Sequence, residues 1–115
     1  MDISELNRRC QNRESFLLAA DGNFIGKLTT NMYDVESICN QYGLYGNRYS
    51  ARSVWNPYSQ YGSQYALYSA YNEYTMSPPV IYLRGMQYGY LTKNTYKYNR
   101  VDPDNVMTWM RQNNL

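Results

Sequence analysis

Apolar residues along the chain gather in two short runs, "FLLAA" and "PVIYL". Each run is followed by a turn that contains glycine and then by a second apolar segment. This order is typical of a β-hairpin, and Asp21-Gly22 is the strongest hairpin signal in the chain. The pattern predicts hairpins over residues 16–31 and 79–94.

The two hairpin segments also match each other in sequence. "GNFIGKLTTN" (residues 22–31) and "GMQYGYLTKN" (residues 85–94) share the pattern Gly-x-x-x-Gly-x-Leu-Thr-x-Asn. We therefore expect two similar hairpins that form one small antiparallel sheet.

Both ends of the chain predict helices. Residues 3–13 are polar and compatible with a helix. Residues 102–113 open with Asp102 as N-cap and Pro103 at the first helical position, where its missing N–H is harmless. Three side chains then fall on one face at helical spacing: Val106, Trp109 and Met110.

Between the hairpins, residues 34–75 repeat with a period of sixteen residues. The unit reads Ser-apolar-apolar-Asn-x-Tyr-x-x-Tyr-Gly-x-x-Tyr, twice in full and a third time in part. The aligned positions are Ser37, Ser53 and Ser69; Asn40, Asn56 and Asn72; Tyr42, Tyr58 and Tyr74; Tyr45 and Tyr61; Gly46 and Gly62; and Tyr49 and Tyr65. Asp34 and Ser50 can cap a helical turn in the first two units. We expect one or two turns of helix per unit, then a glycine bend that carries tyrosines.

Units this short cannot bury their apolar residues alone, so they must stack on each other or on the hairpins. The apolar pairs of the unit are Ile38-Cys39, Val54-Trp55 and Ala70-Tyr71. The whole pattern predicts a single α+β domain over residues 1–115. It combines a small antiparallel sheet from two similar β-hairpins, the repeats packed on one face, and terminal helices.

These motifs resemble an uncharacterised bacterial domain in which Gly-x-x-x-Gly-x-Leu-Thr-x-Asn elements flank tandem "NxYGxYGxxYS" units. The resemblance covers roughly residues 16 to 103. It implies a fold and no activity, because no activity is established for that domain. The chain departs from the pattern at Asn47 and Ser59, where glycine or serine is more typical.

Composition and charge exclude several classes of protein. The 115 residues carry a net charge of +2 that is spread along the chain, whereas nucleic-acid binders usually show a clustered basic stripe. The densest basic cluster, Arg8, Arg9 and Arg13, is expected to be a solvated helix face. No signal-peptide h-region and no run near the roughly 18 apolar residues of a membrane span is present, so we expect a soluble cytoplasmic protein.

An enzyme is not expected, because the chain has no histidine and no carboxylate pair spaced as an acid/base dyad. The "DPDN" segment lacks the glycine and glutamate of a calcium loop, and helix capping explains it more simply. We therefore expect no metal and no cofactor. Cys39 occupies a bulky repeat position and is interpreted as a core thiol; Cys10 can be exposed.

The fifteen tyrosines allow a structural and a functional interpretation. As a packing device, each ring would stack on the next unit. If instead the first ring of each unit packs inward, an outward aromatic and basic strip forms from Tyr45, Arg48, Arg52, Tyr61 and Tyr68. Such a strip predicts a small adaptor or inhibitor that binds another protein. The alternatives are a glycan- or nucleic-acid-binding domain with stacked tyrosines, and a homodimer through an exposed hairpin edge or the aromatic strip.

Overall fold

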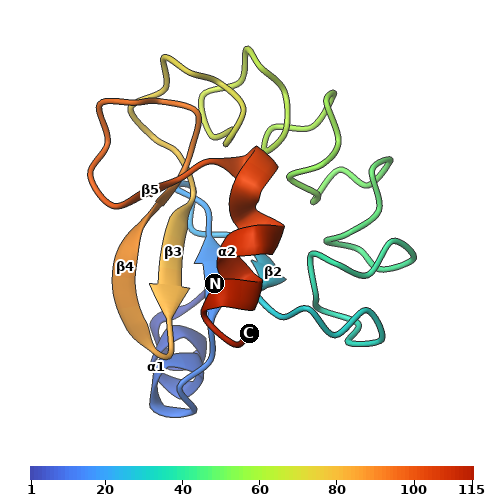
Figure 1. Cartoon of the computed structure of the whole chain (residues 1–115), viewed down its shortest axis with the longest axis vertical. Coiled ribbons are helices and arrows are strands. Elements are labelled where there is room, and N and C mark those ends of the chain that lie inside the picture. The colour runs from blue at the N-terminus through green and yellow to red at the C-terminus, as the bar shows by residue number, and fades with distance from the viewer.

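The computed structural model describes residues 1–115 and contains one five-stranded sheet with helices at both ends of the chain (Figure 1). The elements in chain order are α1 (Ile3–Gln11), β1 (Phe16–Leu18), β2 (Phe24–Lys27), β3 (Val80–Leu83), β4 (Met86–Leu91), β5 (Arg100–Val101), the 3-10 helix η1 (Pro103–Asn105) and α2 (Val106–Gln112). This architecture confirms the expected α+β class. Neither α-helix has the length and apolar character needed to cross a lipid bilayer.

The sheet has the strand order β2-β1-β3-β4-β5. The matching segments form the hairpins β1–β2 and β3–β4, and β1 pairs with β3 antiparallel, with Leu17 opposite Ile81. The antiparallel sheet expected from the two hairpins is confirmed for β1 to β4, and a fifth strand, β5, adds to it in parallel with β4, with Leu91 opposite Val101. Residues 92–99 connect the two strands, since parallel neighbours cannot be joined by a two-residue hairpin turn.

Alternate residues of the strands bury against different layers, as the pleat of a strand requires. On one face, Leu17 and Ile81 belong to the main core together with Met110 of α2. On the other face, the rings of Phe16 and Tyr82 stack with centroids 4.8 Å apart. The first face is therefore covered by α2 and the repeat, and on the second side Arg9 of α1 lies over the ring of Phe24.

Arg9 is buried, so the expectation of a solvated arginine face on α1 is wrong for this residue. Its guanidinium lies 3.9 Å from the centre of the Phe24 ring and forms ion pairs with three carboxylates, those of Glu5, Glu14 and Glu36. Burial lowers the pKa of Arg9, but the hydrogen bonds and charges of Glu36 and Glu14 outweigh burial and raise it. This cluster ties α1 to the β1–β2 hairpin and to the start of the repeat.

The repeat contains no helix, and the expectation of helical turns is wrong. The chain instead forms successive β-turns, in each of which a backbone N–H donates to the carbonyl three residues earlier. The Ser53 N–H, for example, donates to the Ser50 carbonyl at 3.2 Å, and the Asn56 N–H donates to the Ser53 carbonyl at 3.3 Å. Serine and asparagine side chains accept the N–H two residues on, which gives the backbone an alternative to helix. Asp34 and Ser50 do begin turns in this way, bonding the N–H groups of Glu36 and Arg52.

One position of each apolar pair anchors this string of β-turns to the sheet. Ile38, Val54 and Ala70 are all fully buried in the core. Ile38 also lies directly over Gly26 of β2, where any side chain would collide with it. The Ile38 N–H donates to the Lys27 carbonyl, and the Lys27 N–H donates to the Glu36 carbonyl. The start of the repeat therefore covers the outer edge of β2. In Figure 1 the turns follow one another as an arc of loops beside α2.

Candidate functional site

The tripeptide Asn-x-Tyr occurs six times, and in every case it forms the same turn. The asparagine Oδ1 accepts the N–H of the tyrosine at 2.8–3.0 Å, and the asparagine carbonyl accepts the N–H of the residue after the tyrosine. Ser63 and Tyr65 make the same turn with a serine oxygen. The residues involved are Asn31 and Tyr33, Asn40 and Tyr42, Asn47 and Tyr49, Asn56 and Tyr58, Asn72 and Tyr74, and Asn94 and Tyr96.

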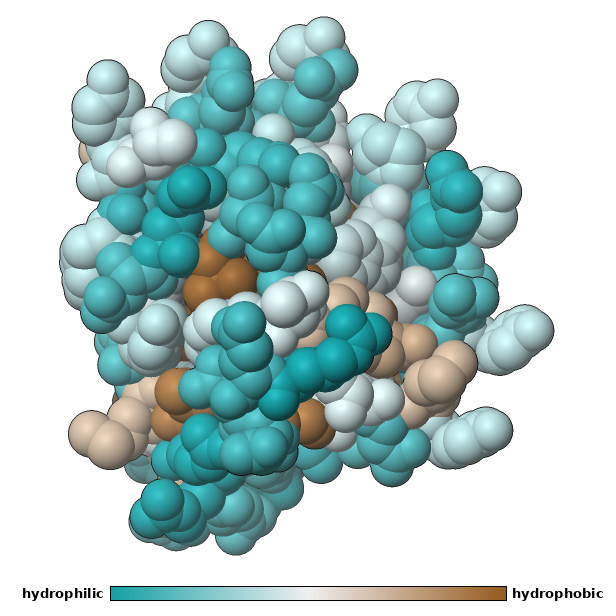
Figure 2. Space-filling view, viewed as in Figure 1, coloured by the Kyte–Doolittle hydropathy of each residue, from teal (hydrophilic) through white to brown (hydrophobic).

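All seven tyrosines of these turns point into solvent. We call them the outward tyrosines; they are Tyr33, Tyr42, Tyr49, Tyr58, Tyr65, Tyr74 and Tyr96, and each is 82–96% exposed. Side chains stand out from the rim of the molecule along the arc of the repeat (Figure 2). The backbone under each ring is held by two hydrogen bonds, one to a side-chain oxygen and one to a backbone carbonyl.

The predicted strip does not form as expected, because the inward and outward rings are exchanged. Tyr61 is only 3% exposed and belongs to the core, so the expectation that it faces outward is wrong. Its hydroxyl donates to Asp21 at 2.7 Å and accepts from Asn23 at 3.0 Å. Burial and the hydrogen bond to Asp21 raise the pKa of Tyr61. Tyr45 is half-buried, with its ring edge-on to Phe24 at 5.0 Å.

The remaining residues of the predicted strip are spread over the repeat. Tyr68 is half-buried against the core, while Arg48 and Arg52 are exposed. The second tyrosine of the unit, Tyr45 or Tyr61, faces inward because it contacts the β1–β2 hairpin. The first tyrosine, Tyr42 or Tyr58, belongs to an Asn-x-Tyr turn and faces solvent. The sequence signal for the outward tyrosines is the recurring Asn-x-Tyr tripeptide. The sixteen-residue alignment contains some of these tripeptides, and others, which end at Tyr33 and Tyr96, lie outside the repeat.

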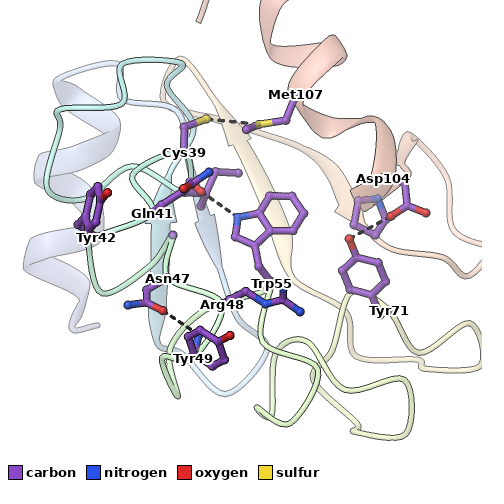
Figure 3. A pocket seen from close by; sticks show the side chains of 13 residues that line it. Cys39, Gln41, Tyr42, Asn47, Arg48, Tyr49, Trp55, Tyr71, Asp104 and Met107 are labelled. Atoms are coloured by element: carbon purple, nitrogen blue, oxygen red, sulfur yellow. Dashed lines mark hydrogen bonds between the residues drawn. The ribbon is translucent and has the colours of Figure 1, made fainter.

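A cleft of about 800 Å³ lies between the repeat and the start of α2. The second residues of the three apolar pairs, Cys39, Trp55 and Tyr71, line this cleft. Side chains from η1, from α2 and from the turn before Ser50 complete its lining. The lining residues are Ile38, Cys39, Gln41, Tyr42, Gly46, Asn47, Arg48, Tyr49, Trp55, Tyr71, Pro103, Asp104 and Met107. In Figure 3 the Trp55 indole lies centrally among the labelled side chains.

Hydrogen bonds hold the walls of this cleft. The Trp55 indole N–H donates to the Ile38 carbonyl at 2.8 Å, and Cys39 Sγ lies 3.3 Å from Met107 Sδ (Figure 3). Burial raises the pKa of Cys39, which keeps the thiol protonated, and both cysteines of the chain are free. On the η1 side, the Tyr71 hydroxyl donates to Asp104 at 3.1 Å.

Charges near the cleft are unevenly paired. Lys93 lies 2.5 Å from an oxygen of Asp104 and 2.8 Å from one of Asp102, and hydrogen bonds to these two carboxylates raise the pKa of Lys93. Burial raises the pKa of Asp102, but the hydrogen bonds from Lys93 and from the Asp104 N–H, together with the charges of Lys93 and Arg100, outweigh burial and lower it. Arg48 forms no ion pair, and its guanidinium carbon lies 5.7 Å from the centre of the Tyr49 ring.

Comparisons with protein-family models, with curated proteins and with solved structures find no match to this chain. No group of three or more cysteine, aspartate or glutamate side chains comes together in a metal-binding arrangement. The features that the geometry itself offers are the outward tyrosines, the cleft beside α2, and a smaller cleft of about 510 Å³ between turns of the repeat, lined by Tyr58, Tyr65 and Tyr71 among others.

Proposed function

We propose that this protein is a non-enzymatic interaction module, a small adaptor or inhibitor that binds another protein through the outward tyrosines. The observation that carries the proposal is that one local device, the Asn-x-Tyr turn, presents the same side chain to solvent again and again. Packing does not account for these rings, since each is 82–96% exposed. The reducing cytoplasm is the compartment we propose, because Cys10 and Cys39 are both free thiols.

A protein partner suits the chemistry of this surface better than the alternatives do. Tyrosine, serine, glycine and asparagine are the residues that antibody paratopes favour, because tyrosine supplies a large amphipathic contact at low conformational cost. The repeat consists largely of these four residues. Nucleic acid would require cations that track the backbone, and among the repeat residues only Arg48 and Arg52 are basic.

The proposal is tested with a variant that removes three neighbouring outward tyrosines, Tyr58→Ser, Tyr65→Ser and Tyr74→Ser. Because the three rings are exposed, the variant should melt within about 2 °C of the wild type. Each lost aromatic anchor should cost roughly 1–2 kcal/mol of binding free energy, so the triple variant should bind about 100-fold or more weakly. The wild type and the variant are compared by affinity capture with quantitative mass spectrometry, then by direct titration with the captured protein.

A matched control changes two exposed residues that lie beside the tyrosines, Gln60→Ser and Gln64→Ser. This control should capture the same partner as the wild type. Capture that persists in the tyrosine variant would contradict the proposal. Binding that falls steeply between about 0.1 and 0.5 M salt, and disappears after nuclease treatment, would instead identify a nucleic-acid ligand. Binding that survives protease treatment of the ligand would identify a glycan.

A further inference from the structure

The cleft between the repeat and α2 has a composition that the outward tyrosines do not explain. We propose that it binds a small amphipathic anion, namely an aryl or branched aliphatic group that carries one carboxylate. The cleft adjoins the proposed protein-binding surface, because two of the outward tyrosines, Tyr42 and Tyr49, line it. Tyr58, Tyr65 and Tyr74 do not line it, so the variant that tests protein binding leaves the cleft residues unchanged.

The apolar part of the cleft suits a ring or a branched chain. Trp55, Met107 and Pro103 contribute flat or flexible apolar surface, and Ile38 lies at the back. A cleft of about 800 Å³ falls within the range of small-molecule sites, which are mostly apolar with a few polar groups that set orientation. The Trp55 indole N–H is already bonded to the Ile38 carbonyl, so the ring presents its surface rather than its donor to a ligand.

The polar part of the cleft favours an anion. Arg48 lines the cleft and forms no ion pair with any carboxylate. Asp104 is the single carboxylate in the lining, and it already accepts bonds from Lys93 and Tyr71. The planar donors of a guanidinium match a carboxylate, which accepts charge-assisted hydrogen bonds at both oxygens.

A cationic ligand would meet the opposite situation. Its charge would approach the unpaired Arg48, and it would have to displace Lys93 from Asp104. Arg111 of α2 adds a second positive charge near the cleft. Burial raises the pKa of Cys39, and the charge of Arg111 acts on the same thiol in the opposite direction. The field at the cleft therefore selects acids over amines that carry the same ring.

The test uses the full-length wild-type protein labelled with ¹⁵N and follows the two indole N–H signals, which a Trp109→Phe variant assigns. The probes are 3-phenylpropionate and 2-phenylethylamine, which share a ring and differ in charge. The Trp55 signal should shift and saturate with 3-phenylpropionate in the millimolar range, and 2-phenylethylamine should shift it little at the same concentrations. Arg48→Gln should weaken binding of the acid about tenfold.

Arg52→Gln is the matched control, because Arg52 is an exposed arginine of the same repeat that does not line the cleft. It should bind the acid as the wild type does. Equal binding of the acid and the amine, equal effects of the two arginine variants, or no saturation with any probe would overturn the proposal. N-acetyl-glycyl-phenylalanine with a free carboxylate is titrated in parallel. If it binds more tightly than 3-phenylpropionate, the carboxylate source is a polypeptide terminus, and if it binds more weakly the source is a free small acid.

Discussion

Asn56 joins two neighbouring turns of the repeat, and its replacement by alanine is expected to destabilise the fold. Its amide nitrogen donates to the Ser50 carbonyl at 2.9 Å, and its Oδ1 accepts the Tyr58 N–H at 3.0 Å. The side chain is buried. Asn47 is a matched control, because its one side-chain hydrogen bond is the bond from the Tyr49 N–H at 2.8 Å.

The expected cost follows from the number of hydrogen bonds lost. A typical intramolecular hydrogen bond contributes about 1 kcal/mol net, so Asn56→Ala should lower the free energy of unfolding by about 2 kcal/mol and Asn47→Ala by about 1 kcal/mol. The Ser50 carbonyl keeps the bond from the Ser53 N–H at 3.2 Å, so no buried acceptor is left without a partner. For a chain of this size, 2 kcal/mol corresponds to a melting temperature lowered by about 8 °C.

Urea and thermal unfolding of the wild type, Asn56→Ala, Asn47→Ala and Asn56→Asp measure this difference. Asn56→Asp keeps the acceptor for the Tyr58 N–H and loses the donor to the Ser50 carbonyl, so it should also be less stable than the wild type. Equal losses for the two alanine variants would refute the reasoning, because they would show that the bond between turns contributes nothing beyond the local turn itself.

Arg9→Ala leaves three carboxylates without their guanidinium and should cost about 3–5 kcal/mol in denaturant titrations. Arg8→Ala, whose side chain is 57% exposed, should stay within about 0.5 kcal/mol, and equal costs would show that the Arg9 cluster is not what holds α1. Gly26→Ala places a methyl group against Ile38 at a φ of 134° and should lower the melting temperature by several degrees; an unchanged melt would mean that the repeat does not pack on β2 as described. Burial, with the charge and hydrogen bond of a neighbouring carboxylate, raises the pKa of Tyr71, so the folded state holds that proton more tightly than the unfolded state. The resulting stabilisation is complete below about pH 10 and is lost as the pH rises further, so Tyr71→Phe should lose less stability than the wild type between about pH 10 and 11 in urea titrations, and parallel curves would contradict the assignment.

The local pattern of the chain was sufficient to predict several elements. The Asp21-Gly22 turn and the apolar runs predicted both hairpins, and Asp102 with Pro103 predicted where the last helical segment begins. These signals are read correctly from sequence because the residues that cause each structure are neighbours in the chain. The sixteen-residue period was also visible, because equivalent residues make equivalent turns.

Local sequence signals do not distinguish helical turns from β-turns in the repeat. Serine and asparagine at short intervals can cap a helical turn, but they can also bond the backbone of successive β-turns, and the sequence contains no apolar stripe that would favour the helix. The side chains of Asn40, Asn56 and Asn72 each also donate to a carbonyl six residues earlier, and this second bond is available only in the string of turns.

The hairpins, the capped terminal helix and the repeating unit all follow from contacts between near neighbours in the chain. Which side of each unit is covered depends instead on the packing of distant segments. Tyr61 is buried because Asp21 and Asn23 of a distant hairpin bond its hydroxyl, and Arg9 is buried because Glu36 and Phe24 surround it. The residues next to Tyr61 or Arg9 in the sequence do not predict its burial, since that burial depends on segments that the fold brings together from far apart in the chain.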